Sequence, residues 1–436
     1  MYTDIDRLVE LAKEDPKRQF FSIAHFITPE KMLAAFRNLR KEASAGVDGV
    51  TYEEYEKDAE GNIQQLYGRL REGKYRAQPL RRVYIPKENG KQRPISIPTL
   101  EDKILQKVVV ELLNAIYEQD FLDCSYGFRP GRGQQQALDE VRRVICTRST
   151  GWILELDIQA YFDSIVREQL MEMIEKRVSD GSVLRLIRKW IKIGVIDKGQ
   201  LLVSETGTGQ GQPISPLLAN IYLHYLLDKW FVEEVKPRLN GEAYEVRFAD
   251  DAILCFEHKE DAEKVLSVLP KRFAKYGLTL HPEKTRLVEF GRHARRNARR
   301  QGKKPATFDF LGFTHICARS RQGKFTVHVK TMAKRLRRGL MAIAEWCREH
   351  RHDPVDQQQR TLNAKLRGHY QYYGRPTNYR SIYQFYRKVR RIWREWLNRR
   401  TRGRWLTWDR FEAILRQHPL LPPRITHAWA SARSTV

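Results

Sequence analysis

Alternating apolar and polar positions along the chain predict several short strands bounded by turns. Residues 243–248 and 252–256 form two such stretches, and the adjacent pair Asp250 and Asp251 lies between them. The pattern therefore predicts a hairpin that carries both carboxylates at its turn. A strongly apolar stretch, residues 152–158, predicts another strand.

Apolar residues spaced three and four positions apart predict amphipathic helices elsewhere. One helix is expected over residues 100–117, where positions 104, 108, 112 and 116 are apolar. The very basic segment 292–304 is expected to be an exposed loop. Other helices are expected at 29–39, 167–178, 182–193, 213–227 and 262–276, and other strands at 82–86, 93–98, 307–316 and 325–329.

From about residue 331, helical periodicity combines with a large excess of basic residues. Residues 331–436 contain 24 Lys and Arg against 7 Asp and Glu, and six of the nine tryptophans. Arginine interleaved with aromatic residues suits RNA, through phosphate contacts and base stacking. A helical domain with an aromatic core and solvated arginines would have the same composition, so both interpretations stay open. The candidate RNA-binding residues are Arg367, Arg387, Arg390 and Arg394.

Length and composition limit the class of protein. With 436 residues and a net charge of +26, the chain is expected to have two or three domains and to bind a polyanion. It contains no apolar run long enough to span a membrane. Its five scattered cysteines favour a reducing cytoplasm and argue against a disulfide framework or a zinc knuckle.

Three carboxylates acquire a common role if the strands that carry them are neighbours. Asp157 ends the 152–158 strand, and Asp250 and Asp251 occupy the hairpin turn, so all three would meet at one edge of a sheet. The hard cation Mg²⁺ suits such a cluster, and two ions roughly 4 Å apart can clamp an in-line phosphoryl transfer. The alternative is an ordinary solvated turn with Asp157 as a strand cap.

The order of motifs along the chain resembles that of reverse transcriptases encoded by group II introns. Residues 153–163, 207–220 and 247–251 are similar to the motifs of the polymerase palm, and residues 362–374 are similar to the maturase region. The other segments that resemble this family are 45–49, 86–98, 126–131, 277–285, 310–313 and the helix 380–400.

The resemblance covers nearly the whole chain and implies a right-hand polymerase, that is, an α+β fold followed by an all-α basic domain. It divides the chain into an N-terminal helical extension (1–80), fingers and palm (81–330) and a thumb or maturase domain (331–436). The implied activity is RNA-directed DNA synthesis from dNTPs at a primer 3′-OH. The implied partners are an RNA template, a DNA primer and the parent intron RNA, whose splicing and mobility the protein would assist.

The resemblance also implies roles for individual residues. Asp157 and Asp250 would bind two Mg²⁺ ions with help from the Ile158 carbonyl, and Asp251 would complete the acidic site. Phe162 falls at the sugar-gate position, where a bulky ring would exclude a ribose 2′-OH; without the resemblance it would be interpreted as a core aromatic residue.

Four further residues are expected to contact the dNTP. Lys87 and Arg93 would hold the triphosphate, although without the resemblance they would be two charges of a solvated hairpin. Gln210 would pack against the nucleotide. Lys284 would act as an acid or contact a phosphate, and its alternative is a surface lysine.

The sequence departs from the family pattern in several places. Phe248 stands where many relatives have tyrosine, residues 209–212 replace Pro-Gln-Gly-Gly, and residues 281–282 stand where asparagine is more common. These changes affect primer contacts, nucleotide grip and fidelity rather than the carboxylates. The cysteine pairs of the family's endonuclease domain are absent, so we expect a bacterial type without that domain, which uses primers that it does not cut.

Two alternatives to an intron-encoded polymerase remain at this point. The protein could be chiefly an RNA-binding splicing cofactor with weak polymerase activity. It could also be a domesticated reverse transcriptase that works in DNA repair or phage defence. Asp157, Asp250 and Asp251 are all present, which argues against a vestigial active site.

Overall fold

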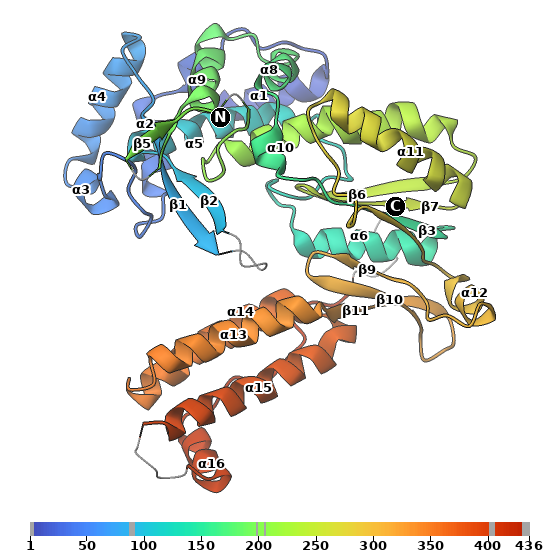
Figure 1. Ribbon diagram of the computed structural model, residues 1–436. Helices are drawn as coiled ribbons and strands as arrows, with labels where there is room; N and C mark the ends of the chain where they lie inside the picture. The colour runs from blue at the N-terminus through green and yellow to red at the C-terminus, as the bar shows by residue number, and fades with distance from the viewer. Residues whose placement is uncertain (1–3, 87–91, 198, 205, 401–405, 430–436) are drawn as a thin grey trace.

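The computed structural model describes residues 4–86, 92–197, 199–204, 206–400 and 406–429. Figure 1 shows a body of mixed helices and sheets and, apart from it, a group of long helices formed by the C-terminal part of the chain. The predicted fold, an α+β body followed by basic helices, is confirmed. The proposed division at residues 80 and 330 stays a prediction.

A four-stranded antiparallel sheet, here called the central sheet, lies in the middle of the body. Its strand order is β6-β7-β3-β8. The predicted hairpin is present as β6 and β7, which pair along their whole length. The strands are β3 (Trp152–Leu156), β6 (Ala243–Phe248), β7 (Asp251–Phe256) and β8 (Arg286–Glu289).

A second sheet lies nearer the N-terminus and has the order β2-β1-β4-β5. The predicted basic hairpin forms its antiparallel β1–β2 pair, and β1 also pairs with β4 in parallel. The connection between β1 and β2 lies outside the described residues. The strands are β1 (Leu80–Pro86), β2 (Gln92–Ile97), β4 (Val195–Asp197) and β5 (Gln200–Leu202).

The expected single strand over residues 307–316 is wrong. The structure has two strands there, β9 (Thr307–Phe310) and β10 (Phe313–Arg319), and β10 pairs further with β11 (Phe325–Thr331). Leu311 and Gly312 have φ values of 48° and 79°, as a tight hairpin turn requires. The continuous apolar run hides this turn because only Gly312 signals it.

The expected exposed loop over residues 292–304 is also wrong in part. Residues Ala294–Arg300 form a short helix, α12, whose first residue is buried while most of its arginines are exposed. With only seven residues, the helix is too short to show an apolar stripe. Its single buried anchor, Ala294, carries no periodic signal.

The helix expected over 100–117 is present as α5 (Leu100–Tyr117), which begins where the Thr99 hydroxyl accepts from the backbone N–H of Asp102. Its apolar face is fully buried in the largest core of the molecule. The remaining helices of the body are α1 (Asp4–Glu14), α2 (Pro29–Arg37), α3 (Tyr52–Glu56), α4 (Ala59–Arg71), α6 (Gln134–Thr147), α7 (Tyr161–Ser164), α8 (Arg167–Glu175), α9 (Gly181–Lys192), α10 (Ser215–Leu223) and α11 (Lys259–Lys275).

The C-terminal helices pack around a separate apolar core. The periodic positions Ile382, Phe385 and Val389 are buried there, as their spacing predicts. The helices are α13 (Ala333–Glu349), α14 (Val355–Tyr373), α15 (Tyr379–Asn398) and α16 (Trp408–Gln417). None of the helices in the described part of the chain combines the length and apolarity that a membrane span requires.

Candidate active site

The β6–β7 hairpin carries two acidic residues at one edge of the central sheet. Phe248 pairs with Asp251, so Ala249 and Asp250 form a two-residue turn between the strands. Ala249 has a φ of 56°, a left-handed conformation that a residue other than glycine adopts at a cost. The turn is therefore strained and needs support from its surroundings.

Asp157 follows β3 directly and lies at the same edge of the sheet. Leu156 pairs with Ala252, the residue after Asp251, so the ends of the two neighbouring strands carry carboxylates side by side. Lys284 Nζ donates to Asp157 Oδ2 across 3.0 Å. Asp157, Asp251 and Lys284 line an open pocket of about 590 Å³. The structure thus brings the three predicted carboxylates together.

Burial and repulsion from neighbouring carboxylates make Asp250 and Asp251 bind protons more readily. Burial, with the charges of Asp250 and Asp157, raises the pKa of Asp251 to about 7. Burial also raises the pKa of Asp250, and the charge of Arg93 opposes that rise. Asp251 keeps an exposed surface, so solvent screening limits the size of the effect. The oxygen atoms of three neighbouring carboxylates are ligands that a hard divalent cation prefers.

Arg93 and Gln210, which were both expected to contact the nucleotide, are hydrogen-bonded to each other in the structure. Arg93 Nε donates to Gln210 Oε1 across 2.8 Å, and the Gln210 carbonyl accepts from the backbone N–H of Ser96. Because the charge of Arg93 also acts on Asp250, this pair lies on the side of the second sheet that faces the carboxylates. Lys87 lies outside the described residues.

Two other predicted residues are largely buried. Phe162 is 8% exposed, and its backbone carbonyl accepts from the N–H of Thr208. Thr208 lies in a loop that contains Gly207, Gly209 and Gly211. Ile158 is also 8% exposed and forms an isolated bridge with Leu280. Neither residue lines the pocket, and both belong to the largest apolar core, which agrees with the core role that the sequence also allowed for Phe162.

A fully buried arginine supports the strained turn. Arg247 Nε and Nη2 donate to the two carboxylate oxygens of Asp228 across 2.7 and 2.6 Å. Its Nη1 donates to the Ala249 carbonyl at 2.9 Å and to Asn220 Oδ1 at 3.1 Å, and Nη2 reaches Ser125 Oγ at 2.8 Å. Arg247 therefore connects the acidic turn to three other segments of the body.

The segment 126–131, which resembles a fingers motif, packs against the same turn. The backbone N–H of Tyr126 donates to the Arg247 carbonyl across 2.9 Å. A Cβ atom at Gly127 would lie 2.3 Å from the Ala249 nitrogen, closer than any real side chain permits. Glycine is required at position 127 because the backbone of the acidic turn passes this close.

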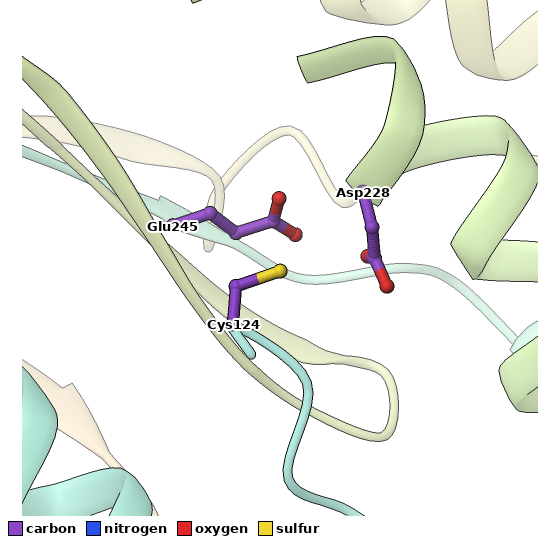
Figure 2. Close-up of side chains that lie close together, drawn as sticks. All are labelled: Cys124, Asp228 and Glu245. Atoms are coloured by element: carbon purple, nitrogen blue, oxygen red, sulfur yellow. The ribbon is translucent and has the colours of Figure 1, made fainter. Parts of the chain in front are cut away.

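A second group of side chains that could bind a metal lies beside Arg247. Ligand atoms of Cys124, Asp228 and Glu245 lie within 4.8 Å of one another, and Figure 2 shows Cys124 and Glu245 pointing toward Asp228. Because Arg247 already engages both oxygens of Asp228, we interpret the group as a buried ion-pair cluster rather than a metal site. Burial and the charge of Asp228 hold the pKa of Glu245 well above its usual range.

Three of the four candidate RNA-binding residues line one groove. Arg387, Arg390 and Arg394 of α15 surround it together with Trp408 of α16, and its volume is about 790 Å³. The Arg394 guanidinium lies 4.2 Å from the centre of the Trp408 ring, and Arg390 forms an ion pair with a carboxylate of α16. Arg367, on α14, is exposed but does not line this groove.

The buried cluster of Arg247, Asp228 and Glu245 was not predicted from the sequence. A signal was present, because Glu245 and Arg247 are charged residues inside an otherwise apolar strand. Asp228 lies where the predicted 213–227 helix should end; in the structure α10 continues there as a π-helical turn, His224–Asp228. This π-helical turn ends at Asp228, the residue that Arg247 contacts. The spacing of apolar residues in the sequence gives no sign of such a turn.

Comparisons with known proteins agree with this geometry. Residues 85–315 match the family described as reverse transcriptase (RNA-dependent DNA polymerase). The chain is 38% identical over 225 residues to Protein YkfC of Escherichia coli (strain K12), covering 50% of this chain and 59% of that protein. It is 35% identical over 243 residues to the Group II intron-encoded protein LtrA of Lactococcus lactis subsp. cremoris, covering 55% and 40%.

A yeast relative extends the same pattern. The Putative COX1/OXI3 intron 1 protein of Saccharomyces cerevisiae is 30% identical over 214 residues, which cover 49% of this chain and 25% of that protein. The chain spans about half the length of the curated relatives that it matches first. The resemblance to group II intron proteins is confirmed. With more than half of its residues matched, this chain belongs to the reverse transcriptase (RNA-dependent DNA polymerase) family.

Proposed function

We propose that the chain is an RNA-directed DNA polymerase of the group II intron type, which copies an RNA template and also binds its parent intron RNA. The observation that carries the proposal is the meeting of Asp157, Asp250 and Asp251 at one open edge of the central sheet. Divalent-metal dependence is general in the family, and we infer that two Mg²⁺ ions serve here.

The carboxylates determine how the reaction proceeds. Asp157 and Asp250, with the Ile158 carbonyl, would hold the ions, and Asp251 would complete the site. When bound, the ions lower the pKa of the primer hydroxyl and stabilise charge at the α-phosphate. The primer 3′-hydroxyl gives its proton to water, its oxygen bonds to the α-phosphorus, the bond from that phosphorus to the bridging oxygen breaks, and pyrophosphate leaves. Lys284, 3.0 Å from Asp157, serves as an acid for pyrophosphate or as a phosphate contact.

The second sheet supplies the nucleotide contacts in this proposal. Arg93, together with Lys87, holds the triphosphate, and its hydrogen bond to Gln210 keeps the guanidinium beside the carboxylates. Phe162 excludes a ribose 2′-OH and so favours dNTPs. The α15 groove, in which the Arg394 guanidinium lies over the Trp408 ring, and Arg367 contact RNA phosphates. We place the protein in the cytoplasm, because its five scattered cysteines suit a reducing compartment.

The competing interpretation, a splicing cofactor with weak polymerase activity, needs the basic groove but not the acidic edge. Asp250 and Asp251, whose pKa values are raised, cost folding free energy unless they serve chemistry. The direct experiment offers the purified chain a labelled DNA primer on an RNA template, with dNTPs and Mg²⁺. We expect full-length cDNA. Tight RNA binding without extension would favour the splicing cofactor.

A further inference from the structure

A second strongly basic surface lies on the body, outside both the acidic pocket and the α15 groove. It is formed by α12 and by the turn between β10 and β11, which together line a hollow of about 800 Å³. We call it the α12 surface and define it by six exposed cations: Arg292, Arg295, Arg296, Arg299, Arg319 and Lys324.

The charge of the α12 surface is not compensated within the protein. Residues 290–325 contain ten Lys and Arg and one acidic residue. Among the described residues, no carboxylate lies within ion-pair distance of the six cations. The nearest acidic candidate in sequence, Glu289, accepts from Asn297 Nδ2 across 2.6 Å instead. Cations gathered without counter-charges repel one another, which a polyanionic partner relieves.

The surface is held rigidly on the central sheet. Phe290 and Ala294 are buried, and the Phe290 ring packs edge-on against Phe308 with centroids 4.7 Å apart. The backbone N–H of Phe290 donates to the Gly151 carbonyl at 2.9 Å. The Asn297–Glu289 bond fixes the helix itself. Because the arginines are presented on a fixed support, binding requires little ordering of the backbone.

The α12 surface lies far from the acidic pocket. Residues 309–312 line the pocket, whereas the surface begins at the other end of β10, with Arg319. Phe313 and Arg319, the two ends of β10, are six positions apart, about 20 Å at roughly 3.3 Å per residue. The shorter strand β8 runs between the same two surfaces, since Arg286 lines the pocket and Glu289, at its other end, precedes α12. One rigid body therefore carries two surfaces about 20 Å apart.

We infer that the α12 surface binds the phosphate backbone of folded, double-helical RNA while the acidic pocket is engaged elsewhere. This inference rests on the proposed function, because it assigns part of the intron RNA to this face. Arginine forks suit phosphates by paired hydrogen bonds, and a hollow suits a rounded duplex backbone. All residues from 290 to 325 are described, and none of their large apolar side chains is exposed, which argues against insertion into a membrane.

The test compares two variants of equal net charge in the full chain. One carries Arg295→Glu, Arg296→Glu and Arg299→Glu; the control carries Lys259→Glu, Lys264→Glu and Lys271→Glu, exposed positions on α11. The probe is a blunt RNA hairpin duplex, titrated by fluorescence anisotropy over a series of salt concentrations. We expect the α12 variant to bind at least about tenfold more weakly and its log–log salt slope to fall by about 2, while the control changes little.

Two parallel measurements separate this inference from the proposed function. Primer extension on a short primer–template is expected to be unchanged in the α12 variant, because the acidic pocket lies about 20 Å away. If wild-type protein fails to extend any primer, the proposed function fails even where duplex binding depends on α12. If the two variants bind the duplex equally, the inference is overturned. Binding to phosphatidylserine vesicles that depends on α12, with RNA binding unchanged, would overturn it as well.

Discussion

Arg247 and Asp228 form a two-fold hydrogen-bonded ion pair directly behind the acidic turn, and neither side chain has any exposed surface. The pair couples the folding of the central sheet to the geometry of the active site, since the same guanidinium also holds the carbonyl of the strained residue Ala249. Burial disfavours the charge of Arg247, but Asp228 outweighs this effect and raises its pKa.

Breaking this pair is expected to be costly. Asp228→Asn leaves a buried arginine without its counter-charge, so the free energy of unfolding should fall by about 3–5 kcal/mol in urea titrations. Glu263→Gln, which removes an exposed ion pair with Lys259, serves as the control and should change stability by less than about 1 kcal/mol. Equal effects of the two substitutions would mean that the buried pair has no special role.

The close approach of Gly127 to the acidic turn leads to a second prediction, on activity and stability. Gly127→Ala forces the turn to move, so primer extension should fall by at least about tenfold and stability by about 1–3 kcal/mol. Gly68→Ala is the matched control, because a Cβ there meets nothing within 4 Å and lies in α4. That substitution should stabilise the chain by about 0.5–1 kcal/mol. Normal extension by Gly127→Ala would contradict the packing argument.

The raised pKa of Glu245 leads to a prediction of how the stability of the protein depends on pH. Its pKa is raised in the folded protein. Its contribution to the free energy of unfolding is therefore fully present below the unfolded pKa of about 4.3 and is lost as the pH rises through the folded pKa. Glu245→Gln cannot ionise. Measured by urea unfolding from pH 5 to 8, its stability relative to wild type should rise by up to about 1.4 kcal/mol per pH unit. Curves that stay parallel across this range would rule out a neutral Glu245.

The α15 groove predicts a change in salt dependence. Arg387→Glu, Arg390→Glu and Arg394→Glu together should weaken binding to single-stranded RNA and flatten the log–log salt slope by about 0.7 for each lost phosphate contact. Part of the effect will come from Arg390, whose partner Glu412 is left beside a new carboxylate. The α11 triple variant again controls for net charge. An unchanged slope would mean that this helix face is only solvated.

The sequence predicted local features well where one physical signal dominated. The bounds of α5 followed from its apolar spacing, and the β6–β7 hairpin followed from two apolar runs around a polar turn. The Leu311–Gly312 turn escaped because its flanks are as apolar as a single strand. Pairing between residues far apart in sequence was also hidden: the Arg247–Asp228 pair depends on a π-helical turn, and Gly127 on a backbone approach that only the fold creates.

The central claim is that Asp157, Asp250 and Asp251 form the metal site of a polymerase. It is tested most directly by primer extension on an RNA template with wild-type protein and Asp250→Asn, with RNA affinity measured on the same preparations. We predict that the variant makes no cDNA, while its RNA affinity and its support of intron splicing stay at the wild-type level. Extension by Asp250→Asn at a rate close to wild type would contradict the metal assignment.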